Sequence, residues 1–157
     1  MQKIAKGVLA AIIVSICILI FINLAFFFPW YSTIVIETFS LSQVASNDNY
    51  IKETYYYSTL DNLKDRPIFR DKPDKVKILV QNSDGSRAIG YDDASYYEGL
   101  SDWEKPYRQR GETITITIEA VYPFTVTLWG EKYEIELPVS FSLRTAGLKH
   151  YKDLEFY

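Results

Sequence analysis

The chain has 157 residues, a formal net charge of −3, one cysteine and one histidine. Lys3 and Lys6 are the only charged side chains before residue 29, so the rest of the chain carries −5. This acidic balance argues against nucleic acid as a partner and against adhesion to anionic lipid. The single cysteine, Cys17, lies inside an apolar run, so the remaining chain forms no disulfide of its own and depends on packing.

Residues 7–28 are almost wholly apolar. As a helix, this run would span roughly 33 Å at about 1.5 Å per residue, enough to cross a bilayer core of about 30 Å. A cleaved secretory signal is the alternative, but its apolar region is usually shorter and ends in small residues, where this chain has the bulky side chains of 26–30. We therefore expect a retained membrane anchor. Its marker residues are Gly7, Val8, Ile12, Ile16, Ile20, Asn23, Phe27 and Trp30.

Basic residues flank this segment only on its N-terminal side. Lys3 and Lys6 precede it without any acid, and short basic flanks stay in the cytoplasm. We expect a single-pass protein of the cell membrane, with a cytoplasmic N-terminus and an extracellular C-terminal domain. Trp30 belongs either to an interfacial aromatic belt or to the packing of the outer domain. Asn23 either bonds to a neighbouring helix or is a tolerated lone amide.

Helical periodicity continues beyond the anchor. The apolar positions recur at three- and four-residue steps, which predicts a helix to about Ser46, bent near Pro29, with a strand over Thr33–Ile36 as the competing interpretation. These positions are Tyr31, Ile34, Val35, Thr38, Leu41, Val44 and Ala45. A break at 47–49 separates the first domain, residues 1–46, from the second, residues 47–157.

A second helix is predicted over Tyr50–Lys64, with one apolar side made of Ile51, Tyr55, Tyr56, Leu60 and Leu63. Lys75–Gln81 alternates as a strand, and after a turn Ser86–Tyr91 is expected to return as its partner. Residues 92–110 read as a long loop with a short helix near 101–103, and a loop of this length is often functional.

Two long alternating runs follow the loop. Every even residue of Ile114–Leu128 is apolar, and after a turn at Trp129–Lys132 the odd residues of Tyr133–Leu143 are apolar. Two period-2 runs around a glycine-containing break predict a long β-hairpin with one apolar face. The helices must cover that face, so the expected fold class is α+β: a long N-terminal transmembrane helix followed by a small domain with a second helix packed on an antiparallel sheet.

Catalytic and metal-binding patterns are absent from the sequence. His150 stands between basic residues and is expected to be solvated, and no Cys/His set has zinc-ligand spacing. Asp84, Asp92 and Asp93 fit turn chemistry better than a calcium site. We predict no enzymatic activity, no cofactor, no metal and no small-molecule substrate.

Aromatic residues gather in the 92–110 loop. Tyrosine buries a large ring while tolerating water at its hydroxyl, so these rings either pad a small core or form a partner surface. The candidate partner surface is Tyr96, Tyr97, Trp103 and Tyr107.

A short basic N-terminus, one apolar helix and the late run ITITIEAVYPFTVTLWGEKYEIELPVSFSLRTAG together resemble the TadE/TadG-like pseudopilins of tight-adherence (Flp) pilus systems, including their Gram-positive relatives. The resemblance covers the anchor and Ile114–Leu143. It implies an α/β domain behind the anchor and partners among pilin-like and membrane assembly proteins. Prepilins of the type IV kind are cut after a glycine, with a glutamate five residues into the mature helix. Lys6-Gly7 matches the cleavage position, but Ile12 stands where those prepilins have the glutamate. The resemblance therefore implies a minor component of the pilus rather than its main subunit.

The predicted function is a membrane-anchored, non-catalytic minor pilin or pseudopilin-like component of a cell-surface pilus or secretion assembly. The lipid bilayer and other assembly proteins are its expected partners. The alternative is a membrane-tethered ectodomain that binds an envelope polymer or a partner protein through the aromatic 92–110 loop.

Overall fold

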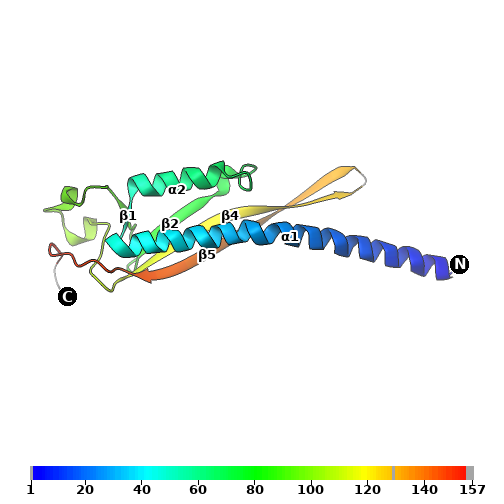
Figure 1. Cartoon of the computed structure of the whole chain (residues 1–157), viewed down its shortest axis with the longest axis horizontal. Helices are drawn as coiled ribbons and strands as arrows, with labels where there is room; N and C mark the ends of the chain where they lie inside the picture. Colours follow the sequence, from blue (N-terminus) through cyan, green and yellow to red (C-terminus); the bar gives the residue numbers. More distant parts are fainter. Residues whose placement is uncertain (1, 129, 155–157) are drawn as a thin grey trace. The chain divides into compact units, whose positions relative to one another are not determined.

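The protein has an α+β fold, seen in a computed structural model that describes residues 2–128 and 130–154 (Figure 1). Its helices are α1 (Gln2–Asp48) and α2 (Glu53–Asp65), with three short 3₁₀ helices, η1 (Pro73–Lys75), η2 (Ala94–Tyr97) and η3 (Asp102–Glu104). A three-stranded sheet has the order β2 (Lys77–Asn82), β4 (Thr113–Leu128), β5 (Glu131–Ala146). A two-stranded sheet pairs β1 (Ile51–Lys52) in parallel with β3 (Ile89–Gly90). The predicted α+β class, with one long N-terminal apolar helix, a second helix and an antiparallel sheet, is confirmed.

The chain forms two compact units. The first unit contains Met1–Thr33 and Tyr122–Leu137, and the second contains Ile34–Val121 and Pro138–Tyr157. Helix α1 and strands β4 and β5 therefore each contribute residues to both units.

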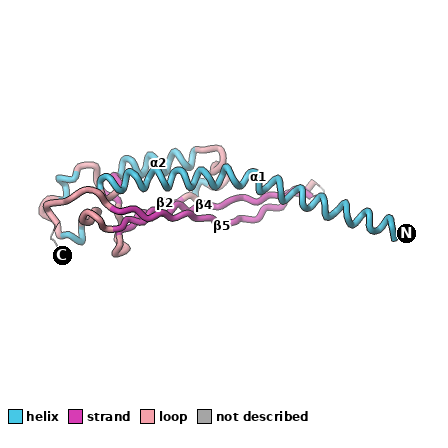
Figure 2. Tube along the Cα trace, turned by 60° about the horizontal axis from the view of Figure 1, so that its bottom comes forward, coloured by secondary structure: helices cyan, strands magenta, loops and turns pink. Residues whose placement is uncertain are grey.

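The second unit has its core between the helices and one face of the sheet. Strand β2 runs antiparallel to β4, with Ile78 opposite Ile118 and Val80 opposite Ile116. All four side chains are buried, because alternate residues of a strand point to the same face and that face is covered (Figure 2). Helix α1 contributes a buried stripe at three- and four-residue spacing: Ile34, Thr38, Leu41 and Ala45. The predicted helix over 31–46 is confirmed and the competing strand is wrong.

Helix α2 covers the sheet with a face that shares Tyr56 and Leu63 with the predicted one and differs from it elsewhere. The Tyr56 hydroxyl donates to the carbonyl of Ile78 at 3.0 Å, and Thr59 and Leu63 are buried. The packed face therefore follows the i, i+3, i+7 positions that begin at Tyr56. Ile51, assigned from the sequence to the apolar side of this helix, lies in β1 because α2 begins only at Glu53, and Tyr55 is exposed.

Helix α1 continues through Pro29 and ends at Asp48. The next residue, Asn49, has a φ of 59°, the left-handed conformation that often follows a helix C-terminus and that asparagine tolerates. Its buried amide donates to the carbonyls of Arg108 and Lys149. A Cβ atom on Gly147 would overlap this amide, so the tight approach requires glycine at position 147.

Two local predictions need correction. Ser86–Tyr91 forms only an isolated bridge from Arg87 to Gln81, because the chain then turns to pair Ile89–Gly90 with β1. The turn after β4 is shorter than the predicted Trp129–Lys132, since β5 already begins at Glu131. Gly130 has a φ of 85°, a left-handed conformation that glycine adopts without strain, and Trp129 lies outside the described residues.

Truncating the centre of β4 should destabilise the second unit. Ile116 is 0% exposed, so Ile116→Ala should lower the free energy of unfolding by about 2–5 kcal/mol. Leu79→Ala, on the open face of β2, should cost clearly less. Urea unfolding of the full chain in detergent, followed by near-ultraviolet circular dichroism, measures both. Equal losses for the two variants would contradict the described core.

Candidate functional site

The candidate anchor is the exposed part of α1 in the first unit. Among the described residues, α1 is the one helix long and apolar enough to cross a membrane, with a mean hydropathy of 3.0 in its most apolar stretch. Four of the predicted anchor residues, Val8, Ile12, Ile16 and Ile20, are exposed. Lys6 and Gly7, the candidate processing site, lie within the helix and are exposed. Such a surface is suited to lipid or to other apolar helices.

Asn23 is the exception within this apolar segment, because it is only 8% exposed. Its amide donates to the carbonyl of Leu19 at 3.0 Å and to the carbonyl of Thr125 at 3.1 Å. The backbone carbonyl of Asn23 accepts a hydrogen bond from the Tyr122 hydroxyl at 2.9 Å. Asn23 therefore joins α1 to β4 within the chain, which neither of the two sequence interpretations anticipated.

Aromatic rings extend this contact by two further turns of α1. The ring of Tyr122 meets Phe27 edge-on at 5.1 Å and Trp30 at 5.2 Å, and offset or edge contacts of this kind stabilise aromatic pairs. Trp30 is buried, and its ring packs on Tyr122 within the first unit. A recess of about 220 Å³ opens between helix and strands. Its walls are Ile20, Asn23, Leu24, Phe27, Tyr122, Phe124 and Leu137.

The second unit contains a tyrosine cluster. It consists of Tyr50, Tyr97, Tyr107, Tyr151 and Leu154, all buried. The rings of Tyr107 and Tyr151 stack at 3.9 Å with an interplanar angle of 11°. The cluster brings the end of α1, the 92–110 loop and the C-terminal segment together, so rings from three distant parts of the sequence form one core.

Each hydroxyl in the tyrosine cluster has a partner. Tyr50 donates to the carbonyl of Tyr91 at 3.0 Å, and Tyr151 donates to the carbonyl of Asp48 at 2.6 Å. Tyr97 accepts from the backbone N–H of Tyr91 at 2.7 Å. Tyr107 donates to a carboxylate oxygen of Asp153 at 2.7 Å. The cluster is thus a satisfied structural network.

Lys105 is linked to this network through Asp153, the partner of Tyr107. Its ammonium group is buried and contacts Asp102 and Asp153, each at 3.2 Å. Burial lowers the pKa of Lys105, but the two carboxylates outweigh burial and raise it. The pKa of Asp153 is lowered. Burial alone would raise it, but the hydrogen bonds from Tyr107 and Lys105 outweigh burial. The paired charges therefore hold each other ionised at neutral pH.

The structure corrects half of the predicted partner surface. Tyr97 and Tyr107 belong to the buried tyrosine cluster, because their rings find partners outside the loop, in Tyr50 and Tyr151. Tyr96 and Trp103 remain at the surface, with exposed fractions of 59% and 75%. No local sequence pattern separates the buried pair from the exposed pair, because the rings that bury Tyr97 and Tyr107 are remote in the chain.

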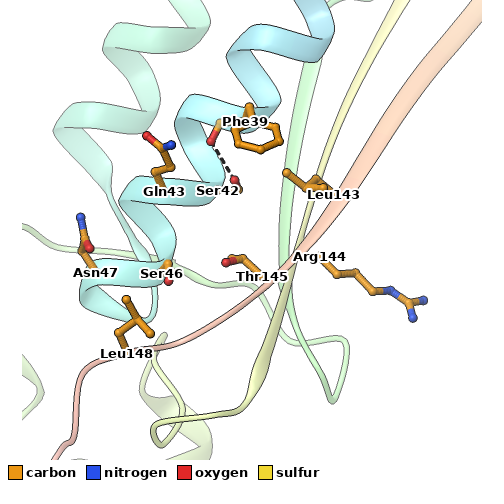
Figure 3. Close-up of a pocket in the computed structure, with 9 residues that line it drawn as sticks. All are labelled: Phe39, Ser42, Gln43, Ser46, Asn47, Leu143, Arg144, Thr145 and Leu148. Carbon is orange, nitrogen blue, oxygen red and sulfur yellow. Dashed lines mark hydrogen bonds between the residues drawn. The ribbon is translucent and has the colours of Figure 1, made fainter.

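A groove of about 510 Å³ lies between α1 and β5 in the second unit (Figure 3). Phe39 stands at one end on α1 and Leu143 faces it from β5, while Arg144 points away from the groove. The polar residues between them are Ser42, Gln43, Ser46, Asn47 and Thr145, and Leu148 closes the other end. No sequence pattern singled out this groove, because it forms only where a helix lies beside an edge strand.

No metal centre is found within residues 2–128 and 130–154, where no three His, Cys, Asp or Glu side chains are grouped to hold an ion. Asp84 instead pairs with Arg108 at 2.8 Å, and Asp92 and Asp93 accept hydrogen bonds from the backbone N–H groups of Thr54 and Ser95. His150 is exposed. In comparisons with protein-family models, curated proteins and solved structures, nothing matches this chain.

Alkaline pH should unfold the second unit through the tyrosine cluster. Burial raises the pKa of Tyr50 from 10.0 to about 12 and raises those of Tyr107 and Tyr151 further. A raised native pKa stabilises the fold below the unfolded pKa, so this stability should be present below pH 10 and lost as pH rises through about 12.

The measurement is urea unfolding of the full chain in detergent at a series of alkaline pH values, with tyrosinate absorbance recorded alongside. Tyr50→Phe keeps the ring and removes the ionisable hydroxyl, so it should flatten the pH dependence. If the variant and the original chain lose stability in parallel across this window, Tyr50 does not carry the effect.

Proposed function

We propose that this protein is a membrane-anchored, non-catalytic component of a cell-surface pilus or secretion assembly, of the minor pilin or pseudopilin kind. One observation carries the proposal: a single helix, α1, exposes apolar residues over the turns around 7–22 and packs its turns from Ile34 onward into a sheet. A helix of this design suits a subunit whose anchor leaves the bilayer only to pack against other apolar helices. The proposal includes β4 and β5 as one long hairpin.

The distribution of charge supports an extracellular second unit. The N-terminal flank of the apolar segment is basic, which favours retention on the cytoplasmic side. The rest of the chain carries −5, so it has little attraction for anionic lipid. We therefore place the N-terminus in the cytoplasm and the second unit outside the cell.

A structural role is also supported by the way the ionisable side chains are used. Lys105 pairs with Asp153, and Asp153 accepts a hydrogen bond from Tyr107. Arg108 pairs with Asp84 and donates to backbone carbonyls. General acid–base catalysis needs a titratable group that is positioned for a substrate. These groups are instead committed to contacts within the second unit.

The groove between α1 and β5 is the surface we propose for a neighbouring subunit. Ile36 and Phe39 of α1 are exposed in the second unit, whereas Ile34, Leu41 and Ala45 of the same helix are buried there. Exposed large apolar residues beside a groove are typical of a protein interface. Binding of an envelope polymer through the 92–110 loop has narrower support, from the exposed side chains Tyr96 and Trp103.

Site-specific photocrosslinking tests the proposed function. A photoreactive amino acid at Phe39 should give adducts with pilin-like or inner-membrane assembly proteins in cells of the source species, identified by mass spectrometry. The same amino acid at Asn62, exposed on α2, serves as the matched control and should give far fewer adducts.

Two results would contradict the proposal. The first is a set of adducts that contains only lipid and unrelated abundant proteins. The second is recovery of adducts from Trp103 but not from Phe39, with a cell-envelope polymer attached, which would favour the binding module.

A further inference from the structure

We propose that the contact between α1 and β4 in the first unit is open while α1 spans a bilayer and closes when α1 leaves it. We call this contact the latch; it joins Asn23, Phe27 and Trp30 of α1 to Tyr122 and Thr125 of β4. The inference rests on the proposed function, because it needs an anchor that starts in lipid and later packs among other apolar helices.

The latch is closed in the structure. The Asn23 amide donates to the backbone carbonyl of Thr125 at 3.1 Å, and the Tyr122 hydroxyl donates to the backbone carbonyl of Asn23 at 2.9 Å. The ring of Tyr122 meets those of Phe27 and Trp30, which come later in α1 than Asn23 does. Since Tyr122 precedes Thr125, β4 runs toward the N-terminus of α1 (Figure 1).

The closed latch brings two sets of charged side chains close together along the axis of α1. Lys6 lies 17 residues before Asn23, about 26 Å along the helix. Beyond Thr125, β4 continues toward the N-terminus of α1 for three more residues, about 10 Å, and β5 then begins with the exposed residues Glu131 and Lys132. Along α1, these two residues are therefore only about 16 Å from Lys6.

A bilayer cannot keep both sets of charges outside its hydrocarbon core, which is about 30 Å thick. With Lys6 at the cytoplasmic boundary, Asn23 lies about 4 Å below the outer boundary, and Glu131 and Lys132 lie about 14 Å below it. Raising α1 until Glu131 and Lys132 leave the core would draw Lys6 about 14 Å into it. Full insertion of α1 and the closed latch therefore exclude each other.

Lipid and the tip strands, residues 122–128 of β4 and 131–137 of β5, compete for the same side of α1. The recess of about 220 Å³ between them is lined by Ile20, Asn23, Leu24 and Phe27 of α1 and by Tyr122, Phe124 and Leu137 of the tip strands. In a bilayer, acyl chains can cover this side of the helix, and outside a bilayer the tip strands cover it. When the latch opens, the Asn23 amide keeps its other bond, to the carbonyl of Leu19.

Pro29 provides a place for α1 to bend away from the tip strands. Proline has no N–H to bond to the carbonyl of Ala25, and helices kink where this bond is missing. Pro29 lies between Phe27, which is part of the latch, and Ile34, where the buried stripe of the second unit begins. A bend at Pro29 can therefore part Asn23 from β4 while the stripe stays packed.

The depth of two fluorescent labels tests the open state. One full-length preparation carries the dye NBD on the native Cys17, and another carries it on Thr127→Cys in a Cys17→Ser background; both positions are exposed. Each is reconstituted in phosphatidylcholine with lipids that carry a nitroxide in the middle of the acyl chain. We expect loss of most of the emission at position 17 and no loss at position 127, because the open latch leaves the tip strands in water.

This measurement separates the latch from the anchor. Comparable quenching at positions 17 and 127 would mean that the latch stays closed in the bilayer, which overturns the inference and leaves the anchor intact. Absence of quenching at position 17 would overturn the anchor, and the proposed function with it.

Spin-label distances test closure. Labels on Cys17 and on Thr127→Cys are measured by double electron–electron resonance in lipid nanodiscs, and again in an amphipathic polymer that coats apolar helices without forming a bilayer. In the closed latch the two positions lie about 9 Å and 7 Å from Asn23 in the same direction along α1. In the open latch Cys17 is about 13 Å below the outer boundary and Thr127 is above it. We expect the separation to shorten on transfer to the polymer.

Matched variants show whether the latch residues cause this shift. Asn23→Leu with Tyr122→Ala removes both hydrogen bonds and the central ring, so the separation should stay long in both media. The control is Ser15→Leu with Tyr133→Ala, because Ser15 bonds to Ala11 within α1 and Tyr133 is exposed on β5. It should shift like the original chain. An unchanged separation in the original chain, or the same shift in both variants, would overturn the latch.

Discussion

The cost of leaving the apolar side chains of α1 in water is the constraint on which this structure depends. Between Val8 and Ile22 the protein itself covers almost none of them, and each large side chain would gain about 1.5–3 kcal/mol from an apolar environment. In a soluble domain, the rest of the chain packs on the helix and buries these side chains. This chain does so for the turns from Ile34 onward, where the sheet buries the helix, and for the side of α1 between Asn23 and Trp30 that β4 contacts.

The second unit meets a different constraint, because it has to hold together without a disulfide. Its C-terminal segment is held by stacked rings and by the hydroxyl of Tyr151, which donates to the end of α1. Asn49 adds hydrogen bonds to both the 92–110 loop and the C-terminal segment, and the absence of a side chain at Gly147 permits them. Fixed rings and satisfied polar groups thus take the place of a covalent link in tying the chain's end to its first helix.

The regular elements were predictable because their residues repeat with a physical period. The alternation in Ile114–Leu128 yielded β4, and the stripe from Ile34 to Ala45 yielded the second half of α1. The tertiary contacts were not predictable in the same way. Asn23 bonds to the backbone carbonyl of Thr125, which has no sequence signature, and Tyr107 stacks on a ring 44 positions later. A cluster of tyrosines in a loop therefore suggests an exposed surface, because the sequence does not show which remote rings bury it.

The central claim is that α1 crosses the membrane and presents the second unit outside the cell. The most direct measurement is labelling of intact cells with a membrane-impermeant maleimide, using single-cysteine variants in a Cys17→Ser background. The account predicts that a cysteine at Ser58, exposed on α2, reacts in intact cells, and that a cysteine at Ile4 reacts only after the membrane is permeabilised. Labelling at Ile4 but not at Ser58 in intact cells would contradict it, as would a mature chain that begins beyond Trp30.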